Sequence, residues 1–324
     1  MDITTQQALG SRPPRRGRVA VLAGLLATLV LAAAGCSGGG GTTDSANGTS
    51  VISAVGAENE YANVLGQLGG RYVHVSAILD NPNTDPHTFE ASPQVAQEVS
   101  SAQLIVQNGV GYDGWMNKIE SASPNPNRKV ITVQRVLGLP ASTPNPHLWY
   151  DPATMPAVAK VMAAGLSTLQ PAHKAYFQAR LTAFNQSLAP WLAAIAQFKA
   201  KLPGTTAATT EPVADYLLTA MGITNLTPFR FQAGIMNGVD PAPQDMALEN
   251  SFFSQHKVKL FAYNQQVTSA LTSSVRDNAL KAGVPVVGVD ETMPTGYTYQ
   301  RWMLAEVNAS SKAVTSKIST QKLS

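Results

Sequence analysis

The sequence is poor in the side chains on which most protein chemistry depends. Its 324 residues include one cysteine and five histidines, and charged residues make up 13% of the chain, about half the roughly 25% of an average soluble domain. One cysteine excludes an internal disulfide framework and any zinc site built on several cysteines. Any metal site in this chain must therefore use imidazoles and carboxylates.

Three sequence motifs of common enzymes are also missing. The chain contains no H-E-x-x-H pair, no Gly-rich phosphate-binding loop and no G-x-S-x-G nucleophile elbow. These motifs carry the zinc-hydrolase, nucleotide-binding and serine-hydrolase chemistries, respectively. We therefore expect a binding protein and not an enzyme.

The excess of positive charge belongs to the first residues of the chain. The whole sequence has 23 Lys+Arg against 20 Asp+Glu, but four of the arginines lie within residues 11–18 and only Asp2 balances them before position 36. Subtracting these leaves 19 basic and 19 acidic residues from position 36 onward. Because no strongly basic surface remains to attract phosphate groups, we expect no nucleic-acid partner.

The N-terminus has the pattern of an export signal. The four arginines precede an uncharged run of 17 residues from Val19 to Gly35, which ends in three alanines and a glycine before Cys36. This run is short of the ~20 residues of a membrane span, and a basic, an apolar and a small-residue region in series are typical of a signal peptide. An anchor that stays attached is the alternative interpretation. The Ala-Ala-Gly-Cys ending resembles a bacterial lipobox, so we predict a signal peptide at 1–35 and lipid attachment at Cys36.

The residues after the cysteine are rich in Gly, Ser and Thr, as SGGGGTTDSANGTS shows. Such a composition forms no packed element, so we predict a flexible tether at 36–50. The mature protein should be lipid-anchored to the outer face of the bacterial cell membrane, in the periplasm or at the cell surface.

Strand and helix patterns alternate along the rest of the chain. Apolar, strand-like runs fall at 51–55, 72–79, 104–107, 129–133, 205–210, 257–263 and 284–289, and helical patterns at 57–68, 112–121, 212–221, 268–282 and 299–318, with a further helix starting at Ser92-Pro93. This alternation is typical of α/β domains with mainly parallel sheets. The stretch 151–201 is almost wholly helical, and Pro190 should kink it. We predict two α/β lobes at 51–165 and 204–324, joined by a long linking helix at 166–203.

Two of the five histidines share an unusual context. His87 follows Asp85-Pro86, and His147 follows Asn145-Pro146. Proline restricts its own backbone and that of the preceding residue, so each imidazole should be held on a stiff loop, where it can serve as a metal ligand. We expect ordinary structural roles for the other three: His74 within a strand, and His173 and His256 on helices.

Carboxylates directly follow two predicted strands. Glu211 comes after the strand at 205–210, and Asp290 and Glu291 come after the strand at 284–289. Ligands of open α/β sheets bind at the carboxyl ends of strands. These acids are therefore candidate metal ligands, although acids at helix N-termini are also favoured for structural reasons.

Four segments, in order, resemble the metal-binding blocks of the cluster A-I substrate-binding lipoproteins, which deliver zinc or manganese to ABC importers. They are DPHTFEASPQVAQEVSSAQLIVQNGVGYDGW (Asp85–Trp115), NPHLWYDP (Asn145–Pro152), EPVADYLLTAMGI (Glu211–Ile223) and VDETMPTGYTYQRWM (Val289–Met303). The resemblance covers nearly all of residues 51–324.

The resemblance implies a ligand set of His87, His147, Glu211 and one acid of the last block. Members of the family usually have Asp in that block, which makes Asp290 the alternative, but Thr292 and the spacing to Tyr299 align Glu291 with the ligand. Two imidazoles and two carboxylates suit Zn²⁺ or Mn²⁺. The third position is not His and no His-rich loop is present, which favours manganese within the family.

The resemblance also implies a function and partners. The protein would capture Mn²⁺ or Zn²⁺ between its lobes, as a monomer, and pass the ion to a membrane permease driven by a separate ATPase. Two alternatives remain at this point: a lipoprotein that binds a metal chelate, and a metal-dependent hydrolase.

Overall fold

The computed structural model describes residues 51–83 and 85–323, which belong to one compact unit. The predicted signal peptide, Cys36 and the tether at 36–50 lie outside the described residues. Among those that are described, no helix combines the length and the apolarity needed to cross a membrane.

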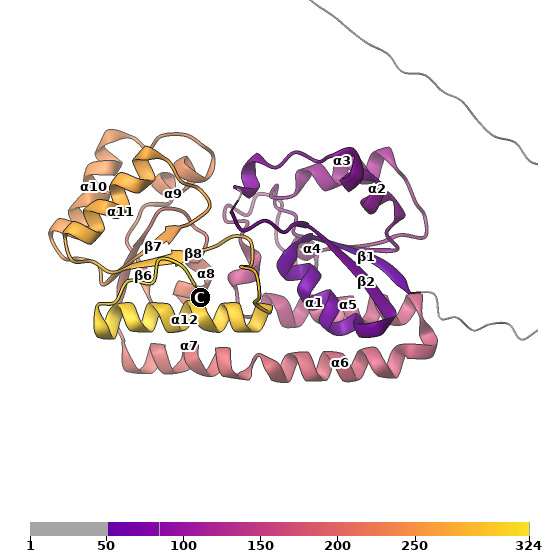
Figure 1. Ribbon diagram of the computed structural model, residues 1–324. Helices are drawn as coiled ribbons and strands as arrows, with labels where there is room; N and C mark the ends of the chain where they lie inside the picture. The colour runs from indigo at the N-terminus through magenta and orange to yellow at the C-terminus, as the bar shows by residue number, and fades with distance from the viewer. Residues whose placement is uncertain (1–50, 84, 324) are drawn as a thin grey trace, which may run out of the picture. The chain divides into compact units, whose positions relative to one another are not determined.

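The N-terminal lobe contains a four-stranded parallel sheet. Its strand order is β2-β1-β3-β4, and helices connect consecutive strands (Figure 1). Its elements are β1 (Ile52–Glu58), α1 (Asn59–Gly69), η1 (Gly70–Tyr72), β2 (Val73–Leu79), η2 (Pro86–Thr88), α2 (Pro93–Ser101), β3 (Leu104–Gln107), α3 (Gly114–Ala122), β4 (Lys129–Thr132), α4 (Val133–Val136) and η3 (Leu148–Tyr150).

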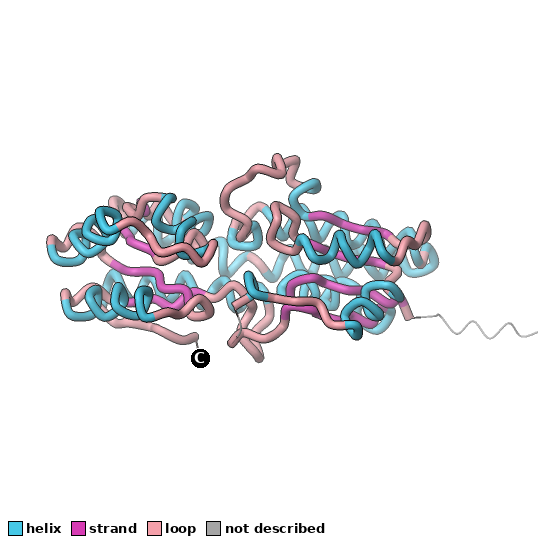
Figure 2. Tube along the Cα trace, turned by 90° about the horizontal axis from the view of Figure 1, so that it is seen from above, coloured by secondary structure: helices cyan, strands magenta, loops and turns pink. Residues whose placement is uncertain are grey.

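The C-terminal lobe repeats this topology. Its parallel strands are in the order β6-β5-β7-β8, and they lie between rows of helices when the molecule is seen from above (Figure 2). Its elements are β5 (Thr206–Thr209), α8 (Asp215–Ala220), β6 (Thr224–Asn225), α9 (Phe229–Met236), α10 (Pro243–Ser254), β7 (Leu260–Asn264), α11 (Ala270–Lys281), β8 (Val286–Val289) and α12 (Tyr299–Ser316).

A helical segment joins the lobes and runs along the base of both (Figure 1). It follows α5 (Thr154–Leu169) and consists of η4 (Pro171–His173), α6 (Lys174–Ser187) and α7 (Ala189–Lys201). Residue 166, the predicted start of the linker, falls within α5. The predicted fold class, two α/β lobes with parallel sheets and a long helix between them, is confirmed.

The kink expected at Pro190 is an interruption at Leu188, between α6 and α7. Proline has no N–H, and its ring collides with the carbonyl four residues earlier. The helix therefore ends one turn early and restarts with Pro190 in its first turn.

The sequence patterns missed α4, β6, α9 and α10. The helix α10 buries Asp245 and Glu249 beside Phe252 and Phe253, so its buried face is not an apolar stripe. Asp245 accepts hydrogen bonds from Arg230, and Glu249 accepts one from Thr227. Because polar residues with partners occupy the inner face, hydrophobic periodicity does not reveal this helix.

Buried aromatic side chains hold the lobes on this helical base. Tyr299 of α12 contacts Trp191 of α7 with ring centres 5.8 Å apart, and its hydroxyl donates to the carbonyl of Trp149 at 2.6 Å. On the other side, Asn59 exchanges two hydrogen bonds of 2.9 Å with the backbone of Met293. The hydrogen bonds between Asn59 and Met293 link the N-terminal lobe to the chain that follows β8, close to the candidate ligands.

Candidate metal site

The predicted site residues lie at the carboxyl ends of the strands in both lobes. His87 follows β2, and His147 follows β4 and α4; Glu211 follows β5, and Glu291 follows β8. This is the edge at which open parallel sheets bind their ligands. The fold therefore brings histidines from one lobe toward carboxylates from the other.

Local hydrogen bonds fix the backbone of each histidine. The Asp85 carboxylate accepts from the backbone N–H of His87 at 2.8 Å, and the Asn145 side-chain carbonyl accepts from that of His147 at 3.0 Å. Both are turns in which an Asx side chain mimics the backbone, with proline at the central position. The two Asx-Pro-His segments thus form the same local structure.

Three of the predicted ligands converge. The Nε2 atoms of His87 and His147 lie 3.2 and 3.0 Å from the same oxygen, Oε2 of Glu291. Ligand atoms of these three residues all lie within 4.8 Å of one another, and within the described residues no other such group of His, Cys, Asp or Glu is found. The side chains of His147 and Glu291 are fully buried, whereas that of His87 is 22% exposed.

The orientation of His147 is set by Asn145. The Nδ1 atom of His147 lies 2.8 Å from Oδ1 of Asn145, whose Nδ2 donates to the carbonyl of Pro212 at 2.7 Å. Because the amide nitrogen faces Pro212, Oδ1 must accept the imidazole Nδ1–H. Nε2 then faces Glu291 at 3.0 Å and is the nitrogen that can offer a lone pair to a metal ion.

His87 and Glu291 shift one another's protonation. Burial opposes the charged form of His87, but the hydrogen bond and charge of Glu291 outweigh it and raise the pKa of His87. Burial likewise opposes ionisation of Glu291, and the two histidines outweigh it and lower its pKa well below the usual range. Each of these contacts between an imidazole nitrogen and Oε2 of Glu291 requires a proton or a metal ion between the two atoms.

Asp290 faces a different environment from Glu291. Its backbone carbonyl accepts from the hydroxyl of Tyr150 at 2.7 Å, and its side chain lines a separate pocket with Lys322 of the C-terminal tail. Burial raises the pKa of Asp290 to about 7, although Lys322 opposes the shift. The structure thus places Glu291, and not Asp290, with the two histidines.

Glu211 lies beside the three-residue group without belonging to it. Its Oε1 accepts from Nδ2 of Asn264 at 3.0 Å, and the same nitrogen donates to Oε1 of Glu291 at 2.7 Å. Oε2 of Glu211 is buried without a hydrogen-bond partner among the described residues. Burial and the nearby charge of Glu291 raise the pKa of Glu211 well above its usual value.

Sequence patterns did not single out Tyr112, whose hydroxyl donates to Oε2 of Glu291 at 2.9 Å. Tyr112 follows a turn in which Gly109, Val110 and Gly111 all have positive φ, of 84°, 54° and 82°. The Asp113 carboxylate accepts from the backbone of Gly109 at 2.9 Å and supports the turn. The two glycines around a single residue are the sequence signal of this turn.

Two further carboxyl groups lie buried near the site in the N-terminal lobe. Glu58 ends β1 and Glu60 lies in the first turn of α1, and their oxygens have no hydrogen-bond partner among the described residues. Burial is the main cause that raises the pKa of both well above the usual value. The raised pKa favours the neutral form of both groups.

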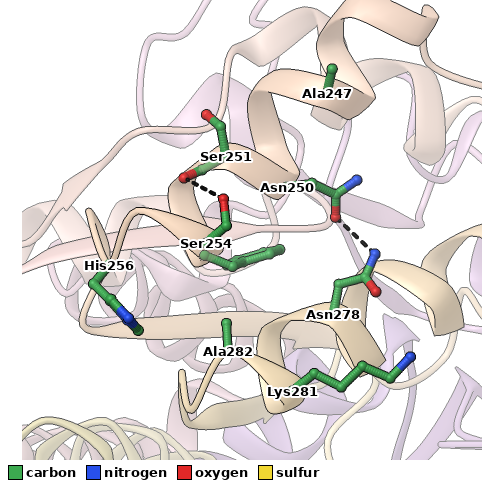
Figure 3. A pocket seen from close by; sticks show the side chains of 9 residues that line it. Ala247, Asn250, Ser251, Ser254, His256, Asn278, Lys281 and Ala282 are labelled. Atoms are coloured by element: carbon green, nitrogen blue, oxygen red, sulfur yellow. Dashed lines mark hydrogen bonds between the residues drawn. The ribbon is translucent and has the colours of Figure 1, made fainter.

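The other histidines lie apart from the site. His74 is exposed on β2, and His173 stacks on Tyr72 with ring centres 3.8 Å apart. The sequence pattern predicted His256 on a helix, and this prediction is wrong. His256 follows α10 in a left-handed conformation with φ of 52°. It lines an open pocket with Lys281 and with Asn278, which hydrogen-bonds Asn250 (Figure 3). No Asp, Glu or Cys lines this pocket, so its residues do not form a metal site.

Comparison with known proteins finds relatives among the substrate-binding proteins of metal ABC transporters. The family model of the periplasmic zinc-uptake complex component A matches residues 56–313. The chain is 27% identical to the metal ABC transporter substrate-binding lipoprotein ScbA of Streptococcus cristatus over 176 residues, 51% of this chain and 55% of that protein. It is 26% identical to the manganese ABC transporter substrate-binding lipoprotein PsaA of Streptococcus pneumoniae over 182 residues, 52% of this chain and 55% of that protein. The chain thus spans about half the length of these curated relatives.

Solved structures show the same fold over a larger part of the chain. The crystal structure of ZnuA superposes with a TM-score of 0.67 and 22% identity, covering 82% of this chain and all of that one. The predicted fold therefore agrees with an experimental structure.

Proposed function

The chain belongs to the ZnuA family of metal substrate-binding proteins of ABC transporters, and we propose that it captures Mn²⁺ or Zn²⁺ between its lobes for import. This family consists of solute-binding proteins, so the expectation of a binding protein and not an enzyme is confirmed. The observation that carries the proposal is the convergence of His87 and His147 from one lobe on Glu291 from the other.

The ligands in this proposal are His87, His147, Glu211 and Glu291. The metal-facing atoms are the Nε2 atoms of both histidines and Oε2 of Glu291, which already point at one another. Oε2 of Glu211, buried and without a partner among the described residues, is the fourth. Two neutral imidazoles and two carboxylates neutralise a divalent cation, and four protein ligands suit capture better than catalysis, which needs an open position.

The partners and location of the protein complete the proposal. The ion would pass to an ABC permease driven by its ATPase, from a monomer held at the outer face of the membrane by a lipid on Cys36. Residues 1–35 would direct export and 36–50 would form the tether. The lobes would comprise 51–165 and 204–324, with 166–203 as the linking helix.

Metal analysis of the purified protein tests this function. We expect one tightly bound ion per chain after incubation with Zn²⁺ or Mn²⁺, and loss of that ion in His87→Ala. The matched control is His74→Ala, which removes an exposed histidine of the same lobe and should leave binding unchanged. Absence of bound metal in the wild type, or equal binding by both variants, would refute the proposal.

A further inference from the structure

The strand order of the C-terminal lobe places one residue between the two glutamates. Strand β7 lies between β5 and β8 in the sheet. Glu211 follows β5, Glu291 follows β8, and Asn264 is the last residue of β7. Since the strands are parallel, the end of the middle strand lies between the acids that follow its two neighbours.

The side-chain amide of Asn264 contacts both acids at once. Its Nδ2 donates to Oε1 of Glu291 at 2.7 Å and to Oε1 of Glu211 at 3.0 Å. An amide nitrogen has two hydrogens, so both are used, one for each carboxylate.

Other hydrogen bonds prevent this amide from turning over. Its Oδ1 accepts from the backbone N–H of Gln266 at 2.9 Å, and its own backbone N–H donates to Thr210 Oγ1 at 2.9 Å. Asn264 is also completely buried. A flipped amide would place an oxygen against two carboxylates and an NH₂ group against an N–H, so only the observed orientation is satisfied.

The consequence is that each glutamate presents one oxygen to the site. Oε1 of both residues is held by Asn264, whereas Oε2 of Glu291 faces the histidines and Oε2 of Glu211 has no hydrogen-bond partner among the described residues. A carboxylate that binds a metal through both oxygens would have to turn Oε1 toward the ion and so distort its hydrogen bond to Asn264.

We propose that Asn264 is a positioning residue that limits each glutamate to a single oxygen and thereby shifts the preference of the site toward Zn²⁺ and away from Mn²⁺. This inference rests on the proposed function. Two imidazole nitrogens and two oxygens make four donors, the number typical of tetrahedral Zn²⁺. Mn²⁺ suits octahedral sites rich in oxygen, and two bidentate carboxylates would supply six donors. The hydrogen bonds of Asn264 thus oppose the manganese preference that the absence of a His-rich loop indicated.

The number of zinc neighbours in the wild type tests the inference directly. X-ray absorption at the zinc edge should show four nitrogen or oxygen neighbours in the wild type and five or six in Asn264→Ala. In competition titrations, the ratio of the Mn²⁺ to the Zn²⁺ dissociation constant should fall by about 10-fold or more in this variant, the usual size of effects from residues that orient metal ligands.

Asn225→Ala is the matched control. The amide of Asn225 donates to the Asp215 carboxylate at 2.9 Å and to Thr209 Oγ1 at 3.1 Å in the same lobe, without contacting either glutamate. It should keep four zinc neighbours and the wild-type ratio.

Three outcomes are distinguishable. Five or six neighbours in the wild type, or an unchanged ratio in Asn264→Ala, would overturn the role of Asn264 while leaving metal capture intact. A wild type that binds no metal would overturn the proposed function and this inference with it. If Asn264→Ala fails to fold, the number of zinc neighbours in the wild type still tests the role of Asn264: four would support it, and five or six would overturn it.

Discussion

At the scale of single residues, the proposed site depends on side chains that hold the candidate ligands as much as on the candidate ligands themselves. Asn145 orients His147, Asn264 orients both glutamates, and Tyr112 contacts Glu291. Asn145 contacts Nδ1 of His147, and Asn264 contacts Oε1 of each glutamate, so neither occupies an atom that faces the proposed metal. Tyr112 differs, because its hydroxyl shares Oε2 of Glu291 with the histidines.

Replacing Asn145 with alanine should weaken metal binding without removing a ligand. The variant frees Nδ1 of His147 and removes the bond to the carbonyl of Pro212, so the imidazole loses its fixed tautomer and orientation. We expect a loss of roughly 10- to 100-fold in Zn²⁺ affinity, measured by competition with a chelator. Asn278→Ala, which removes a hydrogen bond to Asn250 far along the chain from the site, is the control. Equal affinity in both variants would contradict the role of Asn145.

Acid should weaken metal binding, since the ion competes with protons for the imidazoles. The pKa of His87 is raised above 6.5 in the metal-free protein, mainly because the bond to Glu291 outweighs burial. Affinity should therefore begin to fall at a pH above 6.5, and binding near pH 6 should release protons. Calorimetric titration in two buffers of different ionisation enthalpy measures that release, and pH-independent affinity between about pH 5 and 8 would refute it.

The free energy of unfolding of the metal-free protein should rise, and not fall, as the pH is lowered toward 6.5. The raised pKa of His87 stabilises the fold below about pH 6.5, and this contribution is lost as the pH rises through the raised pKa. The lowered pKa of Glu291 stabilises the fold above about pH 4.5, and this contribution is lost as the pH falls through the lowered pKa. The pair therefore contributes most between these values. His87→Ala should remove the fall in unfolding free energy that the wild type shows as the pH rises above 6.5, measured by urea denaturation.

At the scale of elements, the glycine turn after β3 positions Tyr112. Gly109 and Gly111 both have positive φ, but a Cβ on Gly109 would come within 2.9 Å of Thr132 and Gln134, whereas one on Gly111 would meet nothing within 4 Å. Gly111→Ala should cost about 1 kcal/mol from backbone strain alone, and Gly109→Ala about 1–3 kcal/mol more. Thermal or urea denaturation measures both, and equal costs would show that packing at Gly109 has no effect.

The elements differ in how far the sequence predicts them. Strands at 104–107 and 129–132 and the helix start at Ser92-Pro93 were predictable, because apolar runs and capping residues are local signals. The helix α10 was not, since its inner face is made of acids whose partners, Arg230 and Thr227, are distant in the chain.

The residues of the candidate site were also predictable only where they form a local sequence pattern. The two Asx-Pro-His segments and the acids that follow strands could be recognised as candidate metal ligands, because each is a local pattern in the sequence. The sequence could not show that Asn264 bridges Glu211 and Glu291, since this depends on the order of β5, β7 and β8 in the sheet. The choice between Asp290 and Glu291 likewise depends on which side chain faces the other lobe.

At the scale of the whole molecule, the lobes are joined by the helical base and by contacts next to the site. Asn59 of the N-terminal lobe exchanges two hydrogen bonds with the backbone of Met293, two residues after Glu291. Asn59→Ala should loosen this contact and speed metal release several-fold, measured by stopped-flow transfer to a chelator. Asn237→Ala removes an amide that donates to the carbonyl of Ala233 in α9, and this variant should release metal at the wild-type rate. If both variants do so, the lobe contact does not govern release.

The central claim is that one divalent metal ion is held between the lobes by His87, His147, Glu211 and Glu291. Anomalous diffraction from crystals of the zinc-bound protein tests it most directly. The account predicts a single strong peak at about 2.0–2.2 Å from Nε2 of both histidines and from one oxygen of each glutamate. A peak at Asp290, at His256 or at a crystal contact, with none among these four residues, would contradict it.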